Sequence, residues 1–145
     1  LPFTLELFVK IDEYTDENDH VIIGQWKNQG EADNSWALIQ SKNGTNYTVK
    51  FVWVDADTGQ TNELDYEGLS SNTWYHVAYV RNAGTFKIYL NGTSYSGSSS
   101  MSFTNESATT PTIGCGSYNN PNSYITGYVS NLRLVPTHCI GWLDR

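Results

Sequence analysis

The chain has 145 residues, 8 Lys and Arg against 15 Asp and Glu, and a formal net charge of −7 at pH 7. This length can bury one hydrophobic core, and the acidic balance argues against nucleic-acid partners, because phosphate binding requires clustered cationic side chains. No apolar run approaches the length of a membrane span, so we expect no membrane insertion.

Short alternating apolar and polar runs, separated by turn residues, follow one another along the chain. This pattern predicts an all-β fold of two packed antiparallel sheets. The serine-rich stretch 94–100 is expected to be a loop, and no stretch shows sustained helical periodicity. The expected strands in chain order are residues 3–11, 21–26, 36–40, 47–54, 61–66, 74–81, 85–90, 111–114 and 125–135.

The domain organisation is expected to be simple. No linker, internal repeat or change of composition divides the sequence, so we expect one domain over residues 1–145. The first residue is Leu1 rather than Met, which indicates a processed or excised piece of a longer protein.

Three segments carry a family resemblance. Residues 74–80 (WYHVAYV) with 85–92 (TFKIYLNG) resemble the characteristic hairpin of laminin-G-like and pentraxin-like domains. Residues 127–134 (GYVSNLRL) resemble the last core strand of this group, and residues 3–11 (FTLELFVKI) resemble its first strand. The resemblance implies a jelly-roll β-sandwich of the concanavalin A-like superfamily, acting as an extracellular or virion-surface recognition module for glycans.

The sequence departs from laminin G domains at Tyr128, where those domains have a cysteine, so their C-terminal disulfide is not carried over. This departure favours the bacterial and phage branch of the fold. The two cysteines present, Cys115 and Cys139, could form one disulfide in an oxidising compartment or be two free thiols. The histidines are scattered, so we expect no zinc site.

An enzymatic alternative comes from Glu63, Asp65 and Glu67, which resemble the catalytic strand of laminarinase-type glycoside hydrolases. Alternate residues of a strand share one face, and a retaining hydrolase needs two carboxyls about 5–5.5 Å apart. Those enzymes are considerably longer, and the next predicted strand follows too closely here. The other interpretation is a solvent-facing acidic strand with Leu64 and Tyr66 turned inward.

A calcium site is a further possibility. Asp55 and Asp57 lie in the segment Asp-Ala-Asp-Thr-Gly, which resembles the start of a calcium loop. The alternative is a plain hairpin turn in which an Asp accepts backbone N–H bonds. Residues 12–19 form a second acidic loop. If a metal binds, we expect weakly held Ca²⁺ that folding does not require.

The candidate ligand-binding loop is residues 116–124. It contains Tyr118, Asn119, Asn120, Asn122 and Tyr124. Aromatic rings can stack on the C–H groups of a sugar, while amides donate to and accept from its hydroxyls. The alternative is a turn-rich connection between two strands.

Tryptophans offer a second aromatic pair at a loop, because Trp26 and Trp36 flank the polar residues 27–35. Core packing is the alternative for each tryptophan, and we expect it for Trp53 and Trp74, which lie within predicted strands. Together, these features favour a non-catalytic, glycan-binding attachment module. The alternatives are a structural virion component with only protein contacts and a laminarinase-type hydrolase.

Overall fold

The computed structural model describes residues 2–16, 18–26, 35–55, 57–82, 85–98, 110–116 and 123–136. This part of the chain forms ten β-strands and no helix, so no helix long and apolar enough to cross a membrane occurs in it. The strands are β1 (Phe3–Ile11), β2 (His20–Gln25), β3 (Trp36–Asn43), β4 (Asn46–Val54), β5 (Thr61–Leu69), β6 (Trp74–Asn82), β7 (Thr85–Leu90), β8 (Thr93–Ser98), β9 (Thr112–Ile113) and β10 (Gly127–Pro136).

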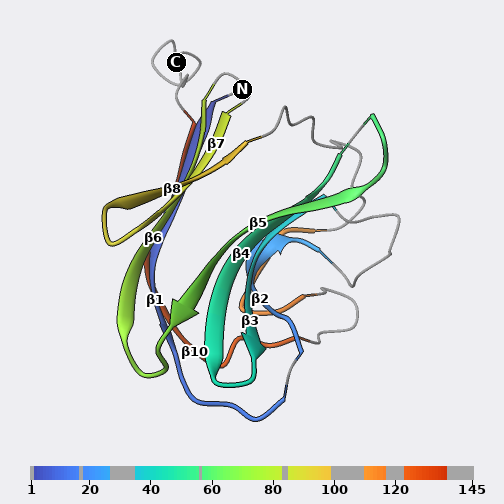
Figure 1. Cartoon of the computed structure of the whole chain (residues 1–145). Helices are drawn as coiled ribbons and strands as arrows, with labels where there is room; N and C mark the ends of the chain where they lie inside the picture. Colours follow the sequence, from blue (N-terminus) through green and yellow to red (C-terminus); the bar gives the residue numbers. More distant parts are fainter. Residues whose placement is uncertain are drawn as a thin grey trace, which may run out of the picture.

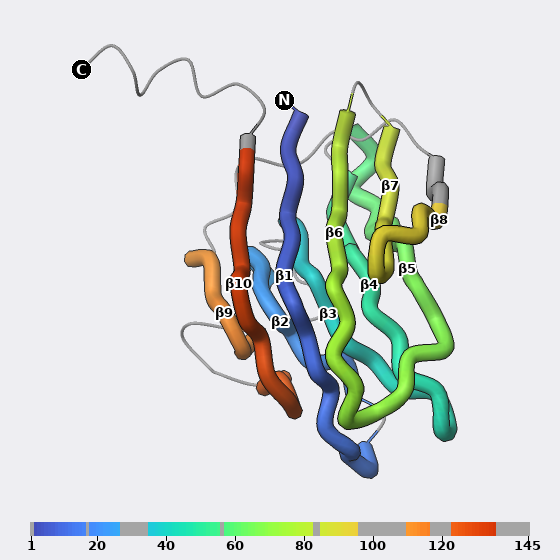
Figure 2. Tube along the Cα trace, turned by 90° about the vertical axis from the view of Figure 1, so that its left-hand side faces the viewer, coloured from blue at the N-terminus to red at the C-terminus, as the bar shows by residue number. Residues whose placement is uncertain are grey.

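Two five-stranded antiparallel sheets face each other, so the predicted jelly-roll sandwich is confirmed (Figure 1). The first sheet has the order β10-β1-β6-β7-β8, and the second has the order β5-β4-β3-β2-β9. β1 and β10 come from opposite ends of the sequence and lie side by side in the first sheet (Figure 2). Strands β2 to β5 are successive neighbours, whereas the chain changes sheets between β1 and β2 and again between β5 and β6.

The main core lies between the two sheets and follows the alternation of the strands. In β1, Leu5, Leu7 and Val9 are completely buried. On the opposing sheet, β4 contributes Phe51, which is also completely buried, and Trp53, which is 3% exposed. The expected core position of Trp53 is therefore confirmed.

The outer face of the second sheet carries a smaller apolar cluster. It consists of Val21, Trp26, Ala37, Ile39 and Val52, each at most 3% exposed. Burial on both faces means that this part of the second sheet does not present its side chains to solvent. The outer face of the first sheet differs in this respect.

The prediction of a loop in the serine-rich stretch is wrong for residues 94–98, because these residues belong to β8. β8 pairs with β7 over its whole length, from Leu90 opposite Thr93 to Thr85 opposite Ser98. The turn residues Asn91 and Gly92 both have positive φ angles, as a tight hairpin requires. The turn and the pairing with β7 therefore account for strand structure in this serine-rich segment.

The expected burial of Trp74 is also wrong, because this side chain is 48% exposed. Along β6, Val77 and Tyr79 take the inward positions and are fully buried. Strand alternation then turns Trp74 to the outer face, where it lies opposite Lys10 of β1.

Gly127 allows β10 to begin close to β1. Its φ of +142° is unfavourable for other residues, and a Cβ at this position would lie 2.1 Å from the carbonyl oxygen of Lys10. We expect Gly127→Ala to lower the free energy of unfolding by about 2–3 kcal/mol, measured by chemical denaturation.

The matched control is Gly59→Ala. Gly59 has a φ of +67°, and a Cβ added there would have nothing within 4 Å, so only the backbone cost of about 1 kcal/mol is expected. Equal losses in the two variants would contradict a steric requirement for glycine at position 127.

Candidate binding surface

The outer face of the first sheet exposes large aromatic side chains. Phe8 is 40% exposed, Trp74 is 48% exposed and Tyr128 is 55% exposed. These residues lie on the adjacent strands β1, β6 and β10, whose outer side faces the reader in Figure 2. Large exposed aromatic side chains gathered on one face of a sheet mark an interaction site more often than scattered surface residues do.

Strand register places these aromatic side chains in two neighbouring rows. In the first row, Lys10 lies opposite Trp74 on one side and Tyr128 on the other. In the second row, Phe8 lies opposite His76, and the two rings are 4.9 Å apart. The rows are two residues apart along β1, so they lie on the same face of the sheet.

A β-bulge shapes β10 beside these rows. Glu6 lies opposite Arg133 and Phe8 lies opposite Ser130, so Asn131 and Leu132 together face the single residue Leu7. Asn131 has a φ of +51°, which accommodates the extra residue. Bulges redirect the side chains of a strand, and Asn131, Leu132 and Arg133 all line a depression here.

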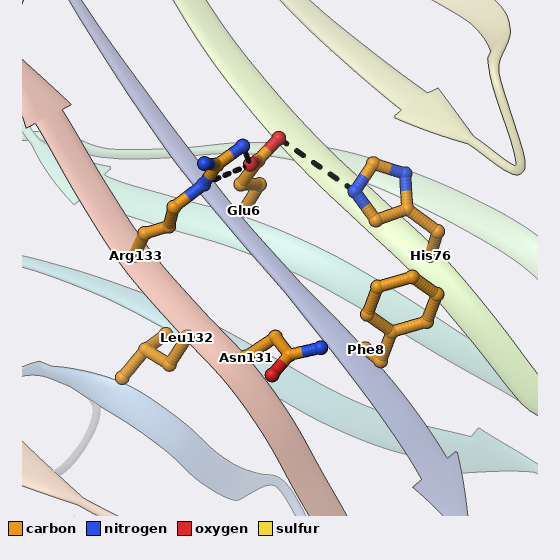
Figure 3. Close-up of a pocket in the computed structure, with 6 residues that line it drawn as sticks. All are labelled: Glu6, Phe8, His76, Asn131, Leu132 and Arg133. Atoms are coloured by element: carbon orange, nitrogen blue, oxygen red, sulfur yellow. Dashed lines mark hydrogen bonds and ion pairs between the residues drawn. The ribbon is translucent and has the colours of Figure 1, made fainter.

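This depression, the Glu6 pocket, has a volume of about 580 Å³. Figure 3 shows the side chains that line it, which come from β1, β6 and β10. Its lining consists of Glu6, Phe8, His76, Asn131, Leu132 and Arg133. The volume lies within the range of about 300–1,000 Å³ that is usual for small-molecule sites.

Glu6 connects the two basic side chains of the pocket. Nε of Arg133 donates to Oε1 of Glu6, and the Arg133 Nη2 atom forms an ion pair with the same oxygen. The other carboxylate oxygen lies 3.6 Å from Nε2 of His76. The Glu6 side chain is only 18% exposed, whereas that of Arg133 is 68% exposed, so the guanidinium is the outer member of the group.

A second cation lies at the edge of this surface. Nζ of Lys10 lies 4.5 Å from the centre of the Tyr128 ring, a cation–π contact, and 3.4 Å from the Asp12 carboxylate. The outer face thus combines aromatic rings with an amide, a carboxylate and cations. Rings of this kind stack on sugar C–H groups, and the polar groups can bond sugar hydroxyls.

A polar network fixes the segment that leads into β10. His20 is buried, and its Nδ1 lies 3.2 Å from Oγ1 of Thr126. The Gln40 amide donates to the Thr126 carbonyl at 3.3 Å. On the other side of the ring, Nε2 lies 3.0 Å from Asp16, whose pKa is lowered by hydrogen bonds from the Asn18 backbone and from His20.

Most of the predicted ligand loop lies outside the described residues, namely Tyr118, Asn119, Asn120 and Asn122. Tyr124 is described and is 59% exposed. The neighbours of Tyr124 are anchored, because the Ser123 carbonyl accepts from the Val21 amide at 2.9 Å and the Ile125 amide donates to Gly114 at 3.0 Å. A ligand site in this loop stays a prediction.

The Asp55 turn has the geometry of a hairpin connection. Oδ1 of Asp55 accepts hydrogen bonds from the backbone of Asp57 at 3.0 Å and from the backbone and hydroxyl of Thr58 at 2.9 and 3.0 Å. No group of three or more acidic, His or Cys side chains suited to a metal occurs in the described ranges. Calcium binding by Asp55 and Asp57 stays a prediction.

The acidic segment forms part of β5, an edge strand of the second sheet. Leu64 is buried, while the Glu63 side chain is 59% exposed and lies 3.9 Å from Lys50. Lys50 also pairs with Asp19 at 3.0 Å. This arrangement agrees with the interpretation of a solvent-facing acidic strand.

Trp26 and Trp36 both pack against buried apolar residues. Trp26 is 3% exposed, and the ring of Trp36 stacks on Phe51 with 5.9 Å between centroids. The polar residues 27–34 between these tryptophans lie outside the described ranges. Cys115 is a half-buried free cysteine, and Cys139 lies outside the described residues.

The residues that form the Glu6 pocket were not predicted as a site. The available signal was the outward phase of β1, because Glu6, Phe8 and Lys10 alternate with buried Leu7 and Val9. An aromatic ring in an outward phase indicates a binding face more directly than polar residues in a loop do.

Comparisons with known proteins give one family and several structures of the same fold. A family model described as the concanavalin A-like lectin/glucanases superfamily matches residues 1–138. No curated protein sequence matches the chain.

Three similar solved structures come from different proteins. The tailspike protein 2 enzymatically active domain of bacteriophage CBA120 has a TM-score of 0.59 and 14% identity, with 92% of this chain and 22% of that chain covered. Domain 4 of a GH43 extracellular arabinanase from Geobacillus stearothermophilus, in complex with arabinotriose, has a TM-score of 0.57 and 15% identity, with 92% and 59% covered. An alginate lyase from Pseudomonas aeruginosa has a TM-score of 0.55 and 14% identity, with 92% and 64% covered. At these identities the likeness shows the fold alone, and the chain spans less than two thirds of each of these structures.

Proposed function

Because the chain belongs to the concanavalin A-like lectin/glucanases superfamily, we propose that it is a non-catalytic glycan-binding module that uses the outer face of its first sheet. The carrying observation is the exposed aromatic group of Phe8, Trp74 and Tyr128 beside the Glu6 pocket. Covering an exposed aromatic ring stabilises a complex by about 1.5–3 kcal/mol through the apolar area removed from water. A sugar ring would cover these side chains without entering a deep cleft.

The similar structures support a glycan as the partner. The arabinanase domain is described in complex with arabinotriose, and another structural match is an alginate lyase. Their sugars are not transferred to this chain, because function depends on site residues rather than on the fold. The chemistry of the outer face supports the proposal independently.

The proposal of a non-catalytic role rests on the carboxylates. Acid–base hydrolysis of a glycoside requires two carboxyl groups that flank one bond. Glu6 is the one carboxylate among the six residues that line the pocket, and Arg133 holds it. Glu63 of the edge strand β5 and Asp19, which directly precedes β2, both lie close to Lys50 instead of flanking a pocket with Glu6.

We further propose that the module acts outside a cell or on a virion surface, as part of a longer protein. The loop 116–124 would then extend the ligand contacts beyond the sheet, since Tyr124 and Tyr128 are both exposed and are four residues apart. Weak Ca²⁺ binding at Asp55 and Asp57 remains part of this proposal, as an accessory to loop structure.

The test is affinity electrophoresis of the wild-type chain through gels that contain individual neutral and acidic polysaccharides. We expect retardation by at least one polysaccharide, and Trp74→Ala should weaken that binding roughly tenfold or more, as loss of a stacking ring does. The same polysaccharides are assayed for released reducing sugar and for unsaturated products of lyase action.

Two results would contradict the proposal. Product formation by the wild type would assign an enzyme, and Glu63→Gln, Asp65→Asn and Glu67→Gln would then identify a hydrolase strand. A chain that binds no polysaccharide but assembles on purified virions would instead be a structural component.

A further inference from the structure

We propose that Arg133 binds a carboxylate of the glycan, so that the ligand belongs to the acidic, uronate-containing polysaccharides. This inference rests on the proposed function, because it assigns a ligand class to the same surface. It adds a role for a pair of side chains, with Arg133 as the contact residue and Glu6 as its positioning residue.

The orientation of the guanidinium is the first argument. Glu6 accepts from Nε and pairs with Nη2 of Arg133, so it occupies one edge of the planar group. A guanidinium has a second edge, formed by its two terminal nitrogens, that can also bind a carboxylate with two parallel hydrogen bonds. The Arg133 side chain is 68% exposed, so a ligand in solvent can approach it.

The position of Glu6 is the second argument. Its side chain is 18% exposed and lies between Arg133 and His76, with 3.6 Å to the imidazole. Arg133 comes from the bulged strand β10, and the opposing Glu6 comes from β1. This ion pair therefore fixes a flexible side chain before the ligand arrives, which reduces the entropy lost on binding.

The surrounding charge is the third argument. The chain as a whole carries a net charge of −7, so its long-range field does not attract polyanions. On the outer face of the first sheet, however, the cations Lys10, Lys87 and Arg133 outnumber the two carboxylates, Glu6 and the Asp12 that pairs with Lys10. The acidic residues of β5 lie on the other sheet. A polyuronate would meet a locally cationic, aromatic surface on an otherwise repulsive molecule.

The experiment compares polygalacturonate with the same polymer after its carboxyl groups have been reduced to alcohols. Binding is measured by isothermal titration with wild type, Arg133→Lys, Glu6→Gln and Lys87→Ala. Arg133→Lys keeps the charge but removes the planar fork, so we expect binding to polygalacturonate to weaken about tenfold or more, while binding to the reduced polymer stays unchanged.

The Glu6→Gln variant distinguishes binding by a positioned Arg133 from general charge attraction. The substitution makes the surface more positive by one charge, so non-specific attraction of a polyanion would increase. Positioning by Glu6 predicts the opposite result, a severalfold loss of affinity for polygalacturonate. Lys87→Ala removes an exposed cation from β7 on the same face and so measures general charge attraction; its loss of affinity should be smaller than that of Arg133→Lys, which keeps the charge.

Several outcomes would overturn the inference. They are wild-type affinity in Arg133→Lys, tighter binding in Glu6→Gln, equal losses in Arg133→Lys and Lys87→Ala, and equal wild-type binding to dextran sulfate. Preference for the reduced polymer would overturn the acidic ligand class and leave glycan binding intact, whereas failure to bind any polysaccharide would overturn the proposed function itself. If Glu6→Gln lowers the melting temperature, the inference is tested by Arg133→Lys alone, because the Arg133 side chain lies largely in solvent and its replacement should not affect folding.

Discussion

Replacing Phe51 with alanine is expected to lower the free energy of unfolding by about 3–5 kcal/mol. Phe51 is fully buried between the sheets, and its ring centroid lies 5.0 Å from that of Phe86 and 5.2 Å from that of Tyr79. Trp36 and Trp53 contact the ring from its own sheet. The truncation therefore removes apolar burial and leaves a cavity at the point where both sheets meet.

Thermal and urea denaturation followed by circular dichroism measure this loss, which corresponds to a fall of about 10–20 °C in Tm. The matched control is Phe51→Leu, which nearly preserves volume and should cost less than about 1.5 kcal/mol. A loss below about 1 kcal/mol in Phe51→Ala would show that the aromatic cluster is not the main stabilising contact between the sheets.

The same burial explains why the sandwich could be predicted from sequence. In β1, the buried residues Leu5, Leu7 and Val9 recur with a period of two, and β4 repeats this with Val49, Phe51 and Trp53. This period of two follows from the alternation of side chains along a strand, so it can be recognised from the residues of each strand alone. Strand positions were accordingly predicted well where one face is apolar.

β8 could not be predicted by that rule. Residues 93–98 alternate no apolar side chains, and their strand structure comes from pairing with β7 across the turn at Asn91 and Gly92. Whether a segment forms a strand by pairing depends on the neighbouring strand, here β7, and a local sequence pattern does not contain that information. The prediction of burial for Trp74 was wrong for a different reason. It followed from the large apolar ring and the strand position, whereas Val77 and Tyr79 occupy the inward positions of β6 and so leave Trp74 on the outer face.

The candidate site depended on long-range register. Glu6 and Arg133 are 127 residues apart in sequence, and they meet because β1 pairs with β10. The bulge at Asn131 then sets which β10 residues line the pocket. Sequence alternation could place Glu6 and Phe8 on an outer face, but neither this pairing nor the bulge can be read from local periodicity.

The double variant Phe8→Ala/Trp74→Ala is expected to lose about 2–6 kcal/mol of binding free energy, if each ring contributes the 1–3 kcal/mol typical of an aromatic stacking platform. This corresponds to a roughly 30-fold to 10⁴-fold weaker Kd. The two residues lie in adjacent rows of the first sheet, on β1 and β6, so one oligosaccharide can contact both. Because Phe8 is 40% and Trp74 is 48% exposed, the melting temperature should change much less than in Phe51→Ala.

The measurement is isothermal titration with the polysaccharide that retards the wild type, together with the single variants. Tyr95→Ala is the matched control. Tyr95 is 53% exposed, but it lies on β8 opposite the buried Ile88 and contacts Tyr66 of the second sheet at 5.8 Å, so it does not belong to the outer face. Its removal should leave Kd within about twofold, as expected for a residue that does not contact the ligand. Wild-type affinity in a folded double variant would place the glycan site elsewhere, and the loop 116–124 would then be the next surface to test through Tyr124→Ala.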